Sequence, residues 1–359
     1  MEIHQVVVGA GPGDAITNAA LDLRDILRQA CPSEVYARFY DQRLHGDVLP
    51  LKDFARRPAA HPEENIILFH ASIGEPEVFN FLQERPERIV VFHHNISPAA
   101  PFVPYDPAFA GRLDGGRREL AALSRRAVMA LAASEFNAED LRSLGYRNVR
   151  VSPLLLDVDR LQALEPNALT VNHFEQMVKG PVVLFVGQLL PHKRPDFLLQ
   201  AYHALTTYLD PEAHLILVGS PRLPRYTAAL ELLVRELHLP RAWITGRVGD
   251  DELVAFYRRA DLFVTASEHE GFCAPLLEAM AFDVPVLARS FAAIPETVQD
   301  AALLLAPDDG PLVMAEAMRL ALEDDALRAG LVRRGRRRLA HFAPDAARAA
   351  LVSHLMELV

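Results

Sequence analysis

Short runs rich in β-branched residues alternate along the whole chain with longer amphipathic segments. One such run, Val-Val-Leu-Phe-Val at residues 182–186, is apolar throughout, which is typical of a strand buried on both faces of its sheet. This alternation predicts an α/β fold in which helices cover both faces of doubly wound parallel sheets. The strands that we expect lie at residues 3–8, 35–40, 65–70, 89–93, 128–132, 149–151, 182–186, 214–218, 242–245, 262–265, 285–288 and 302–305. The helices that we expect lie at residues 14–28, 107–123, 194–209, 225–237, 251–259, 275–282, 310–322 and 344–359.

The length of the chain favours two domains over one, because 359 residues, 50% of them apolar, suffice for two separate cores. The periodic pattern is lost near residues 161–180, a segment that contains Pro166. We therefore expect an N-terminal domain at residues 1–165, a linker at 166–180, a C-terminal domain at 181–342 and a last helix within 343–359. Ligands of open parallel sheets bind beyond the carboxyl ends of the strands, so we expect a site between the two sheets.

Charge and composition exclude several classes of function. A net charge of −10 lacks the basic excess of a duplex-binding surface, so nucleic acid is not an expected partner. The two cysteines, Cys31 and Cys273, do not make a disulfide framework and suit a reducing compartment. No run approaches the about 18–20 apolar residues of a membrane span, and the amino terminus does not read as a signal peptide. We expect a cytoplasmic protein, with peripheral association at the inner face of a membrane as an alternative.

The segment Val-Gly-Ala-Gly-Pro-Gly-Asp-Ala at residues 8–15 follows the first expected strand and resembles a dinucleotide-binding fingerprint. Gly9 and Gly11 fit that fingerprint, but Asp14 replaces its third small residue, where the helix must pack closely on the strand. No acidic residue clearly ends the second strand at the ribose-binding spacing, so a flavin or nicotinamide oxidoreductase is disfavoured. Gly11 and Gly13 instead favour a turn whose N–H groups face an anion or a sugar hydroxyl. A plain strand-to-helix turn stays open as the alternative.

The richest segment is Ala-Ser-Glu-His-Glu-Gly-Phe-Cys-Ala-Pro-Leu-Leu-Glu-Ala-Met-Ala at residues 266–281, which follows an expected strand. Pro275 suits the first helical position, so residues 271–274 place main-chain N–H groups at a helix N-terminus, a phosphate site made of backbone. Glu270 lies just before this helix and can meet a sugar. We expect Glu278 in the first helical turn, where it can accept hydrogen bonds from two vicinal hydroxyls, as a ribose offers. For Glu278 alone, a carboxylate that merely stabilises the helix end is the commoner alternative.

A second loop, Gly-Gln-Leu-Leu-Pro-His-Lys-Arg at residues 187–194, also leaves an expected strand. Lys193 stands just before a helix that begins with Pro195, a position from which its ammonium can neutralise a leaving diphosphate. A single lysine in a loop is more often a solvated surface group, so Lys193 does not establish a site by itself.

These motifs together resemble glycosyltransferase family 4, whose members are retaining enzymes of the GT-B architecture. The resemblance rests on Glu270 and Glu278, with seven residues between them, and it covers nearly all of residues 182–342. The other segments that carry it are residues 187–195, 215–220, 245–261, 284–289 and 293–297, and in the first half residues 12–18, 92–98 and 133–137. It implies two Rossmann-like domains that face each other across a cleft, with the donor on the C-terminal side and the acceptor on the N-terminal side. It also suits a last helix that crosses back to the N-terminal domain.

The resemblance implies roles for individual residues of this chain. Glu270 would contact the transferred sugar, Glu278 the ribose, and Lys193 the diphosphate. His94, or its neighbour His93, resembles the strand-end histidine that meets the sugar, although an isolated buried histidine is more often a core residue. The implied catalytic residues are Glu270, His94 and Lys193. The implied donor-binding residues are Gly13, Gly187, Gln188, Arg194, Gly219, Arg247, Val248, Gly271, Phe272, Cys273, Ala274, Leu276 and Glu278.

Gln188 departs from the family pattern, which has an arginine at this place, five positions before the lysine. One cation for the diphosphate is therefore lost, and Arg194 is the candidate replacement. The departure leaves open a catalytically impaired member that still binds nucleotide sugars. A nonhydrolysing sugar-nucleotide epimerase of the same architecture is a second alternative.

The reaction implied by the resemblance is the transfer of a hexose from GDP-mannose or a UDP-sugar to a glycan, lipid-linked or small-molecule acceptor. Cell-surface polysaccharide or glycoconjugate synthesis is the process in which we expect it. The family implies no metal and no other cofactor, and Asp157 and Asp159, an Asp-x-Asp match, read as hinge surface. The arginine-rich residues 333–338, and the arginine pairs 117–118 and 125–126, suit solvated helix faces or contact with anionic lipid.

Overall fold

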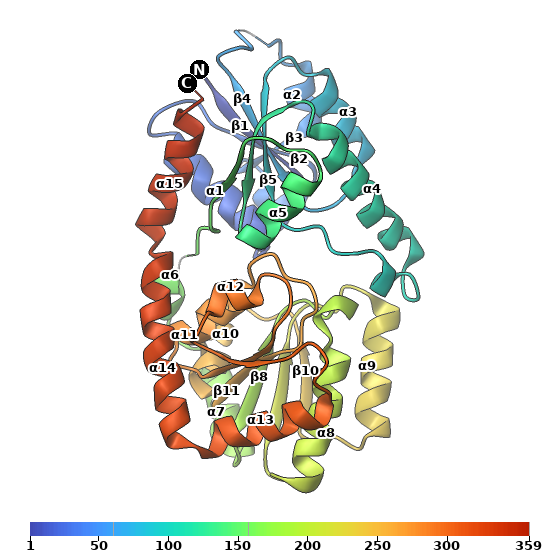
Figure 1. Cartoon of the computed structure of the whole chain (residues 1–359), viewed down its shortest axis with the longest axis vertical. Coiled ribbons are helices and arrows are strands. Elements are labelled where there is room, and N and C mark those ends of the chain that lie inside the picture. The colour runs from blue at the N-terminus through green and yellow to red at the C-terminus, as the bar shows by residue number, and fades with distance from the viewer. Residues whose placement is uncertain (60, 157, 359) are drawn as a thin grey trace. The chain divides into compact units, whose positions relative to one another are not determined.

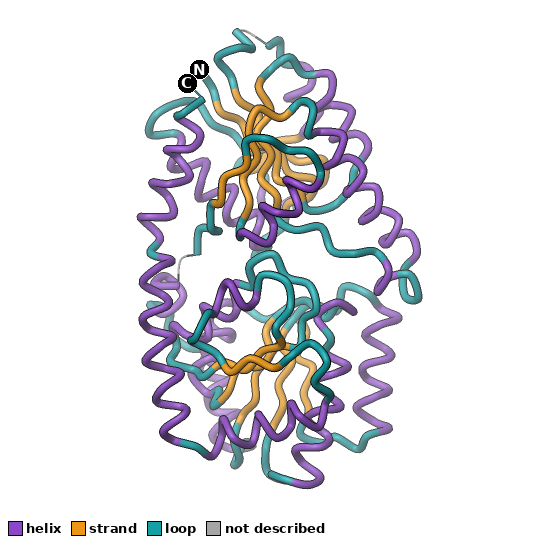
Figure 2. Tube along the Cα trace, viewed as in Figure 1, coloured by secondary structure: helices purple, strands orange, loops and turns teal. Residues whose placement is uncertain are grey.

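A computed structural model describes the chain except Ala60, Asp157 and Val359, and divides it into two compact units (Figure 1). Unit 1 comprises Met1–Val103, Pro107–Leu156 and Ala343–Val359, and unit 2 comprises Pro104–Asp106 and Asp157–Phe342. Each unit is built on a parallel sheet with helices packed against it (Figure 2). Asp157, half of the expected Asp-x-Asp match, lies outside the described residues.

Unit 1 contains a seven-stranded sheet in the order β3-β2-β1-β4-β5-β6-β7, in which every neighbouring pair is parallel. Its strands are β1 Ile3–Ala10, β2 Val35–Tyr40, β3 Val48–Pro50, β4 Ile66–Ala71, β5 Arg88–His93, β6 Ala127–Ala132 and β7 Val149–Val151. Its helices are α1 Ala15–Leu27, α2 Leu51–Arg56, α3 Pro76–Glu84, α4 Pro107–Leu123, α5 Glu135–Ser143 and α15 Pro344–Met356. The strand order reverses at β1 and β4, so the carboxyl ends of these two strands mark the switch point of this sheet.

Unit 2 contains a six-stranded parallel sheet in the order β10-β9-β8-β11-β12-β13. Its strands are β8 Val182–Val186, β9 His214–Val218, β10 Ala242–Gly246, β11 Leu262–Thr265, β12 Val286–Arg289 and β13 Leu303–Leu305. Its helices are α6 Val158–Gln162, α7 Ala168–Met177, α8 Pro195–Tyr208, α9 Pro224–Glu236, α10 Asp250–Arg259, α11 Ala274–Ala281, α12 Ile294–Val298, α13 Pro311–Glu323 and α14 Asp325–Leu339. Here the strand order reverses between β8 and β11. The predicted α/β class with two doubly wound parallel sheets is therefore confirmed.

The segment expected to be a linker, residues 166–180, instead carries helix α7 and lies within unit 2. Asn167 starts this helix by accepting a hydrogen bond from the Thr170 main-chain N–H. Phe174 is buried and packs edge-on against Phe256 of α10, with 5.3 Å between the ring centroids. A linker interpretation fails here because one buried aromatic side chain and a helix cap suffice to fix a short helix whose apolar periodicity is weak.

The last helix, α15, belongs to unit 1. Its Leu351 and Leu355 side chains are buried. The Arg88 side chain of β5 donates a hydrogen bond to the carbonyl of Leu358, so the end of the chain is attached to the sheet. None of the helices in the described part of the chain combines the length and the apolarity that a membrane crossing requires.

Candidate functional site

Three loops at the carboxyl ends of the unit 2 strands, and the last residue of β10, are joined by main-chain hydrogen bonds. The loop after β11 bonds to the loop after β8, since the Glu268 N–H donates to the His192 carbonyl at 2.8 Å. The loop after β8 bonds to the loop after β9 through the Leu189 N–H and the Ser220 carbonyl at 3.1 Å. The Gly219 N–H then donates to the carbonyl of Gly246, at the end of β10, at 3.0 Å. The expected ligand-binding edge of this sheet is therefore one connected backbone framework.

An ion pair between Lys193 and Glu270 lies within this framework. Lys193 stands on the loop after β8 and Glu270 on the loop after β11, so the pair spans the switch point between these strands. The Lys193 Nζ and Glu270 Oε1 atoms are 2.6 Å apart, and the two side chains are 18% and 10% exposed. Burial acts to lower the pKa of Lys193, but the charge and hydrogen bond of Glu270 outweigh it and the pKa lies above its usual value. Two residues separated by 76 others in sequence thus present one positive and one negative group side by side at the place where an open α/β sheet binds ligands.

Helix α11 begins at Ala274, four positions after Glu270, and has no side-chain hydrogen bond at its N-cap, Cys273. Cys273 has left-handed backbone angles, φ 67° and ψ 63°, and Pro275 occupies the first turn. The Thr297 hydroxyl of α12 donates to the Phe272 carbonyl at 2.7 Å and so fixes the loop that leads into the helix. Without a capping side chain, the positive end of the helix dipole is available to an anion, as the sequence predicts.

Glu278 does not lie in the first turn of α11, because this helix begins at Ala274 and its first turn carries no acidic residue. That position corrects the sequence-based prediction and removes the alternative in which Glu278 only stabilises the helix end. Its carboxylate instead accepts a hydrogen bond from the buried hydroxyl of Tyr257, on α10, at 2.7 Å. Burial raises the pKa of Glu278, and the Tyr257 hydrogen bond acts against that rise.

Arg194, the candidate replacement for the cation missing at Gln188, is held by two carboxylates. Its guanidinium bonds Asp196 at 3.1–3.2 Å and also bonds Glu268. The Tyr226 hydroxyl donates to the same Asp196 carboxylate at 2.8 Å. Lys193 is likewise paired with a carboxylate, so this pairing does not exclude Arg194 as a second cation for a diphosphate.

The remaining predicted donor-binding residues of unit 2 lie on the same strand-end loops. Gly187 and Gln188 follow β8, and Gly219 follows β9. A Cβ atom on Gly219 would lie 1.8 Å from the Gly187 carbonyl oxygen, so the two loops approach each other at a distance that only glycine permits there. The others at this edge are Arg247 and Val248 after β10, and Gly271, Phe272, Cys273, Ala274 and Leu276 between β11 and the first turns of α11.

The glycine loop after β1 is a capped turn. The Asp14 carboxylate accepts hydrogen bonds from the Thr17 main-chain N–H and hydroxyl, each at 2.9 Å. The Gly11 N–H donates to the Thr17 hydroxyl oxygen at 3.1 Å, and Gly13 has a left-handed φ of 67°. Asp14 at the third fingerprint position therefore serves as the N-cap of α1 in place of the small residue of a dinucleotide-binding turn.

The two adjacent histidines at the end of β5 have different surroundings. His93 is fully buried and its Nε2 lies 3.2 Å from the Asp140 carboxylate of α5, which Arg117 also binds at 2.7 Å. His94 is less buried, and its Nε2 lies 2.7 Å from Nδ1 of His70 at the end of β4. His93 fits the alternative of a core histidine, and His94 fits the strand-end residue of the resemblance. The sequence reasoning missed His70, although a histidine at the end of an otherwise apolar strand is a usable signal.

Most arginines of the basic run on α14 bind neighbouring elements of unit 2. Arg336 forms a two-point ion pair with Asp283, at 2.7 and 2.6 Å. The Arg338 side chain donates to the carbonyls of Thr297 and Glu296, both at 2.8 Å. These contacts attach α14 to the loop after α11 and to α12, which favours a structural role for this run over lipid contact.

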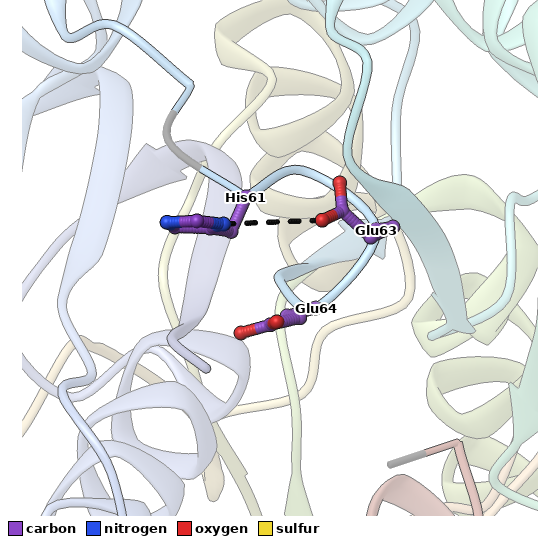
Figure 3. A group of neighbouring side chains, drawn as sticks. All are labelled: His61, Glu63 and Glu64. Atoms are coloured by element: carbon purple, nitrogen blue, oxygen red, sulfur yellow. Dashed lines mark ion pairs between the residues drawn. The ribbon is translucent and has the colours of Figure 1, made fainter.

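One group of three metal-ligating side chains occurs among the described residues: His61, Glu63 and Glu64 (Figure 3). All three are exposed, and His61 Nδ1 lies 3.9 Å from Glu63 Oε1. The group precedes β4, at the amino end of the sheet, so it does not belong to either strand-end site.

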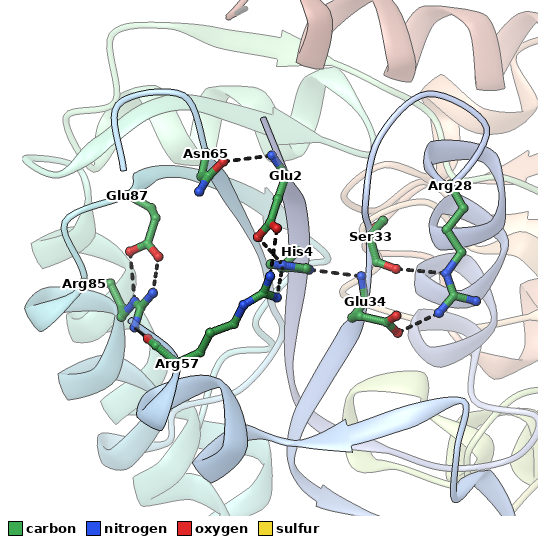
Figure 4. Close-up of polar contacts among 9 residues, drawn as sticks. All are labelled: Glu2, His4, Arg28, Ser33, Glu34, Arg57, Asn65, Arg85 and Glu87. Atoms are coloured by element: carbon green, nitrogen blue, oxygen red, sulfur yellow. Dashed lines mark hydrogen bonds and ion pairs between the residues drawn. The ribbon is translucent and has the colours of Figure 1, made fainter. Parts of the chain in front are cut away.

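The amino ends of β1, β4 and β5 surround a cavity of about 160 Å³ (Figure 4). The charged groups on its wall are paired with each other, since Arg57 bonds Glu2 at 2.7 Å and Arg85 bonds Glu87. His4 is buried there and its Nδ1 accepts a hydrogen bond from the Glu34 main-chain N–H at 3.1 Å. The Arg57, Arg85, Glu2 and Glu87 side chains on this wall therefore bind one another.

Residues 172–338 match the family model described as glycosyl transferases group 1. Over 262 residues the chain is 30% identical to the O-antigen chain mannosyltransferase B of Escherichia coli, a stretch that spans 71% of this chain and 66% of that protein. It is 33% identical over 218 residues to D-inositol 3-phosphate glycosyltransferase of Salinispora arenicola, spanning 58% of this chain and 46% of that relative. The chain thus matches less than two thirds of the length of either curated relative.

Solved structures share the fold over nearly the whole chain. Sucrose-phosphate synthase from Thermosynechococcus elongatus superposes with a TM-score of 0.77 at 19% identity, covering 100% of this chain and 99% of that one. HepE from Anabaena, in a complex with UDP-glucose, superposes with a TM-score of 0.79 at 16% identity, covering 99% and 100%. At these identities the likeness shows the fold, which is the predicted GT-B architecture.

Proposed function

We propose that this chain, whose residues 172–338 match the group 1 glycosyl transferases, moves a hexose from a nucleotide diphosphate sugar to an acceptor hydroxyl. The observation that carries the proposal is the partly buried Lys193–Glu270 pair, 2.6 Å apart, at the switch point of the unit 2 sheet and on the loop that leads into helix α11. A cation, a carboxylate and a positive helix end are the groups that a pyrophosphate-linked sugar needs.

In the proposed donor complex, each group of this edge contacts one part of the nucleotide sugar. Lys193 and the main-chain N–H groups of residues 271–274 hold the diphosphate, and Glu270 contacts the sugar. Glu278 accepts hydrogen bonds from the ribose hydroxyls. The backbone of Arg247 and Val248 flanks the base. The Lys193 ammonium is already held in place by Glu270. An incoming diphosphate would therefore compete with Glu270 for a positive group that is already positioned.

We propose that transfer retains the anomeric configuration and needs no metal. Positive charge at the leaving diphosphate comes from Lys193 and the α11 N-terminus, and charge stabilisation with positioning replaces a covalent nucleophile. In this mechanism the diphosphate leaves as the acceptor hydroxyl approaches on the same face of the sugar. If a chelator abolishes turnover and Mn²⁺ restores it, the metal-independent part of this proposal is wrong.

GDP-mannose and UDP-sugars are the donors that we propose first. The E. coli relative is named a mannosyltransferase, and the Anabaena structure holds UDP-glucose, which supports these two classes. The name of the E. coli relative also supports a glycan or lipid-linked acceptor in cell-surface polysaccharide synthesis. We propose that this reaction takes place in the cytoplasm, with the inner face of the membrane as the alternative.

A thermal-shift screen over GDP-, UDP- and ADP-sugars, followed by calorimetric titration of any hit, tests the donor. We expect one nucleotide class to raise the melting temperature and to bind with a stoichiometry of one. Product analysis without an acceptor then separates the alternatives, because an epimerase converts the sugar whereas a transferase at most hydrolyses the donor slowly. Absence of binding to every nucleotide sugar would contradict the proposal.

A further inference from the structure

A series of three hydrogen bonds, two buried and one partly buried, leads from helix α1 to His94 at the carboxyl edge of unit 1, and we call it the relay. The Gln5 side-chain nitrogen donates to the Ala20 carbonyl at 2.9 Å. The Gln5 Oε1 atom lies 2.8 Å from His70 Nε2, and His70 Nδ1 lies 2.7 Å from His94 Nε2. The two imidazole planes differ by only 11°. Gln5 and His70 are almost fully buried, so water does not provide alternative partners for these atoms.

The first bond fixes the direction of all the others. A carbonyl cannot donate, so the Ala20 oxygen must face the amide nitrogen of Gln5, and the Gln5 oxygen must then face His70. His70 therefore donates from Nε2 and accepts at Nδ1, which requires His94 to donate from its own Nε2. A neutral His94 is left with a bare lone pair on Nδ1.

Both imidazoles are neutral, as this assignment requires. Burial lowers the pKa of His70 to about 3. Burial, with His70 and His93 nearby, also holds the pKa of His94 well below its usual range. A protonated His94 would carry two N–H donors, whereas the series of hydrogen bonds offers it one acceptor, His70 Nδ1.

The His94 Nδ1 atom is buried and has no hydrogen-bond partner among the described residues. An unsatisfied buried acceptor costs about 1–3 kcal/mol, so its retention asks for an explanation. Gln5, His70 and His94 stand on one face of the sheet. Gln5 and Val7 are two positions apart on β1 and so point to the same face, and Val7 pairs with His70. His70 in turn pairs with Phe92, two positions before His94. The three residues cross the β1/β4 switch point, where an open parallel sheet binds ligands.

We propose that Gln5 and His70 are positioning residues that hold His94 in the Nε2–H tautomer, so that its Nδ1 is left to accept a hydrogen bond from a hydroxyl of the sugar substrate, which must displace the atoms that now cover Nδ1. The contact to the sugar rests on the proposed function, whereas the tautomer does not. An acceptor lone pair recognises a hydroxyl donor and repels a phosphate oxygen. His94 therefore selects for a hydroxylated hexose and contributes nothing to binding of the bare nucleotide.

Long-range proton–nitrogen correlation of the full chain, labelled with ¹⁵N-histidine and without ligand, tests the tautomer at pH 7. Spectra of His70→Gln and His94→Gln variants assign the signals. We expect His70 and His94 each to carry the proton on Nε2 and a bare Nδ1. A protonated Nδ1 on His94, or an even mixture of its tautomers, would overturn the relay whatever the protein binds.

Gln5→Met tests the positioning role, since methionine is close in size but offers the relay no oxygen. We expect a mixture of His94 tautomers, a fall of about tenfold in kcat/KM for the nucleotide sugar, and an unchanged Kd for the nucleoside diphosphate alone. Tyr146→Phe is the matched control, because it removes a buried hydroxyl bond to the Leu120 carbonyl of the same unit and leaves the relay intact. If Gln5→Met leaves the His94 tautomer and kcat/KM unchanged, the positioning role is wrong.

Failure of the two proposals can be told apart. If no nucleotide sugar binds the wild-type chain, the proposed function fails while the nitrogen spectra still decide the relay. If a nucleotide sugar binds and turns over but His94 has the other tautomer, the relay fails and the proposed function stands.

Discussion

Lys193 and Glu270 illustrate how much of the proposed chemistry depends on single side chains. Neither is unusual by itself, since lysines in loops and glutamates near helix ends are mostly solvated. Their 2.6 Å contact gives each a buried partner of opposite charge. Removing one partner of such a pair leaves an uncompensated charge, whereas replacing both by neutral groups of similar size is nearly neutral for stability.

Lys193→Met should therefore lower the free energy of unfolding by about 3 kcal/mol, and Lys193→Met with Glu270→Gln should recover most of that loss. Turnover should stay at least about 100-fold below wild type in both variants, because the positive group at the leaving diphosphate is missing. Urea denaturation and a donor-turnover assay measure the two effects. A double variant that regains activity together with stability would show that the pair is only structural.

Gly219→Ala should disturb the donor site through the close approach of the loops after β8 and β9. The added Cβ would lie 1.8 Å from the Gly187 carbonyl oxygen, so the loop after β8 that carries Lys193 must shift. We expect a loss of about 1–3 kcal/mol in the free energy of unfolding and a weaker affinity for the nucleotide sugar. Gly111→Ala, in the exposed part of α4 with no atom within 4 Å of the new Cβ, is the control and should be neutral or slightly stabilising. Equal effects of the two changes would contradict the close-approach account.

At the level of elements, helices α10 and α11 meet through the Tyr257–Glu278 hydrogen bond. If Glu278 accepts ribose hydroxyls, its ionised form is the one that binds the donor. Tyr257 acts to lower the pKa of Glu278 against the opposite effect of burial, so it keeps the carboxylate ionised at a lower pH than burial alone would allow.

Tyr257→Phe should raise the pKa of Glu278 further and shift the acid limb of donor kcat/KM to higher pH. The sign follows because a higher pKa means that more Glu278 is protonated, and unable to accept two hydroxyls, at a given pH. Tyr202→Phe also loses a buried hydroxyl bond, to the Ala213 carbonyl, and should leave the pH profile unchanged. Identical profiles for wild type and Tyr257→Phe would contradict the role of Glu278.

Most strands could be predicted from the sequence because they are continuous apolar runs, and β8, β9 and β11 begin and end at the predicted residues. Strand β3 was missed, since three residues ending in Pro50 carry no readable period. Helix α7 was misjudged because its tertiary contacts, not its periodicity, stabilise it.

The candidate site was only partly readable from the sequence. The family resemblance pointed to Glu270 and Lys193, but their pairing depends on β8 and β11 being neighbours, which is a property of sheet order. The same holds for Gln5 and His70, whose contact crosses from β1 to β4. Local sequence specifies each side chain and its strand, and the strand order decides which side chains meet.

For the molecule as a whole, the chain ends in the unit in which it begins, since α15 belongs to unit 1. Leu355 of this helix is fully buried, whereas its neighbour Met356 is 40% exposed. The stability of unit 1 should therefore depend on the last residues of the chain more than that of unit 2 does.

Leu355→Ala should cost about 2–5 kcal/mol of unit 1 stability, while Met356→Ala on the same helix should cost little. Hydrogen exchange read by mass spectrometry should show faster exchange in β5 and β7, whose Arg88 and Arg150 side chains contact the end of the chain. Exchange that rises equally in β8–β13, or that is the same in both variants, would contradict this assignment.

Calorimetric titration of one nucleotide sugar into the wild-type chain and into the folded Lys193→Met, Glu270→Gln double variant tests the central claim most directly. We predict binding to the wild type with a stoichiometry of one, and at least tenfold weaker binding to the double variant. Equal affinity for both proteins would contradict a donor site at the β8/β11 switch point.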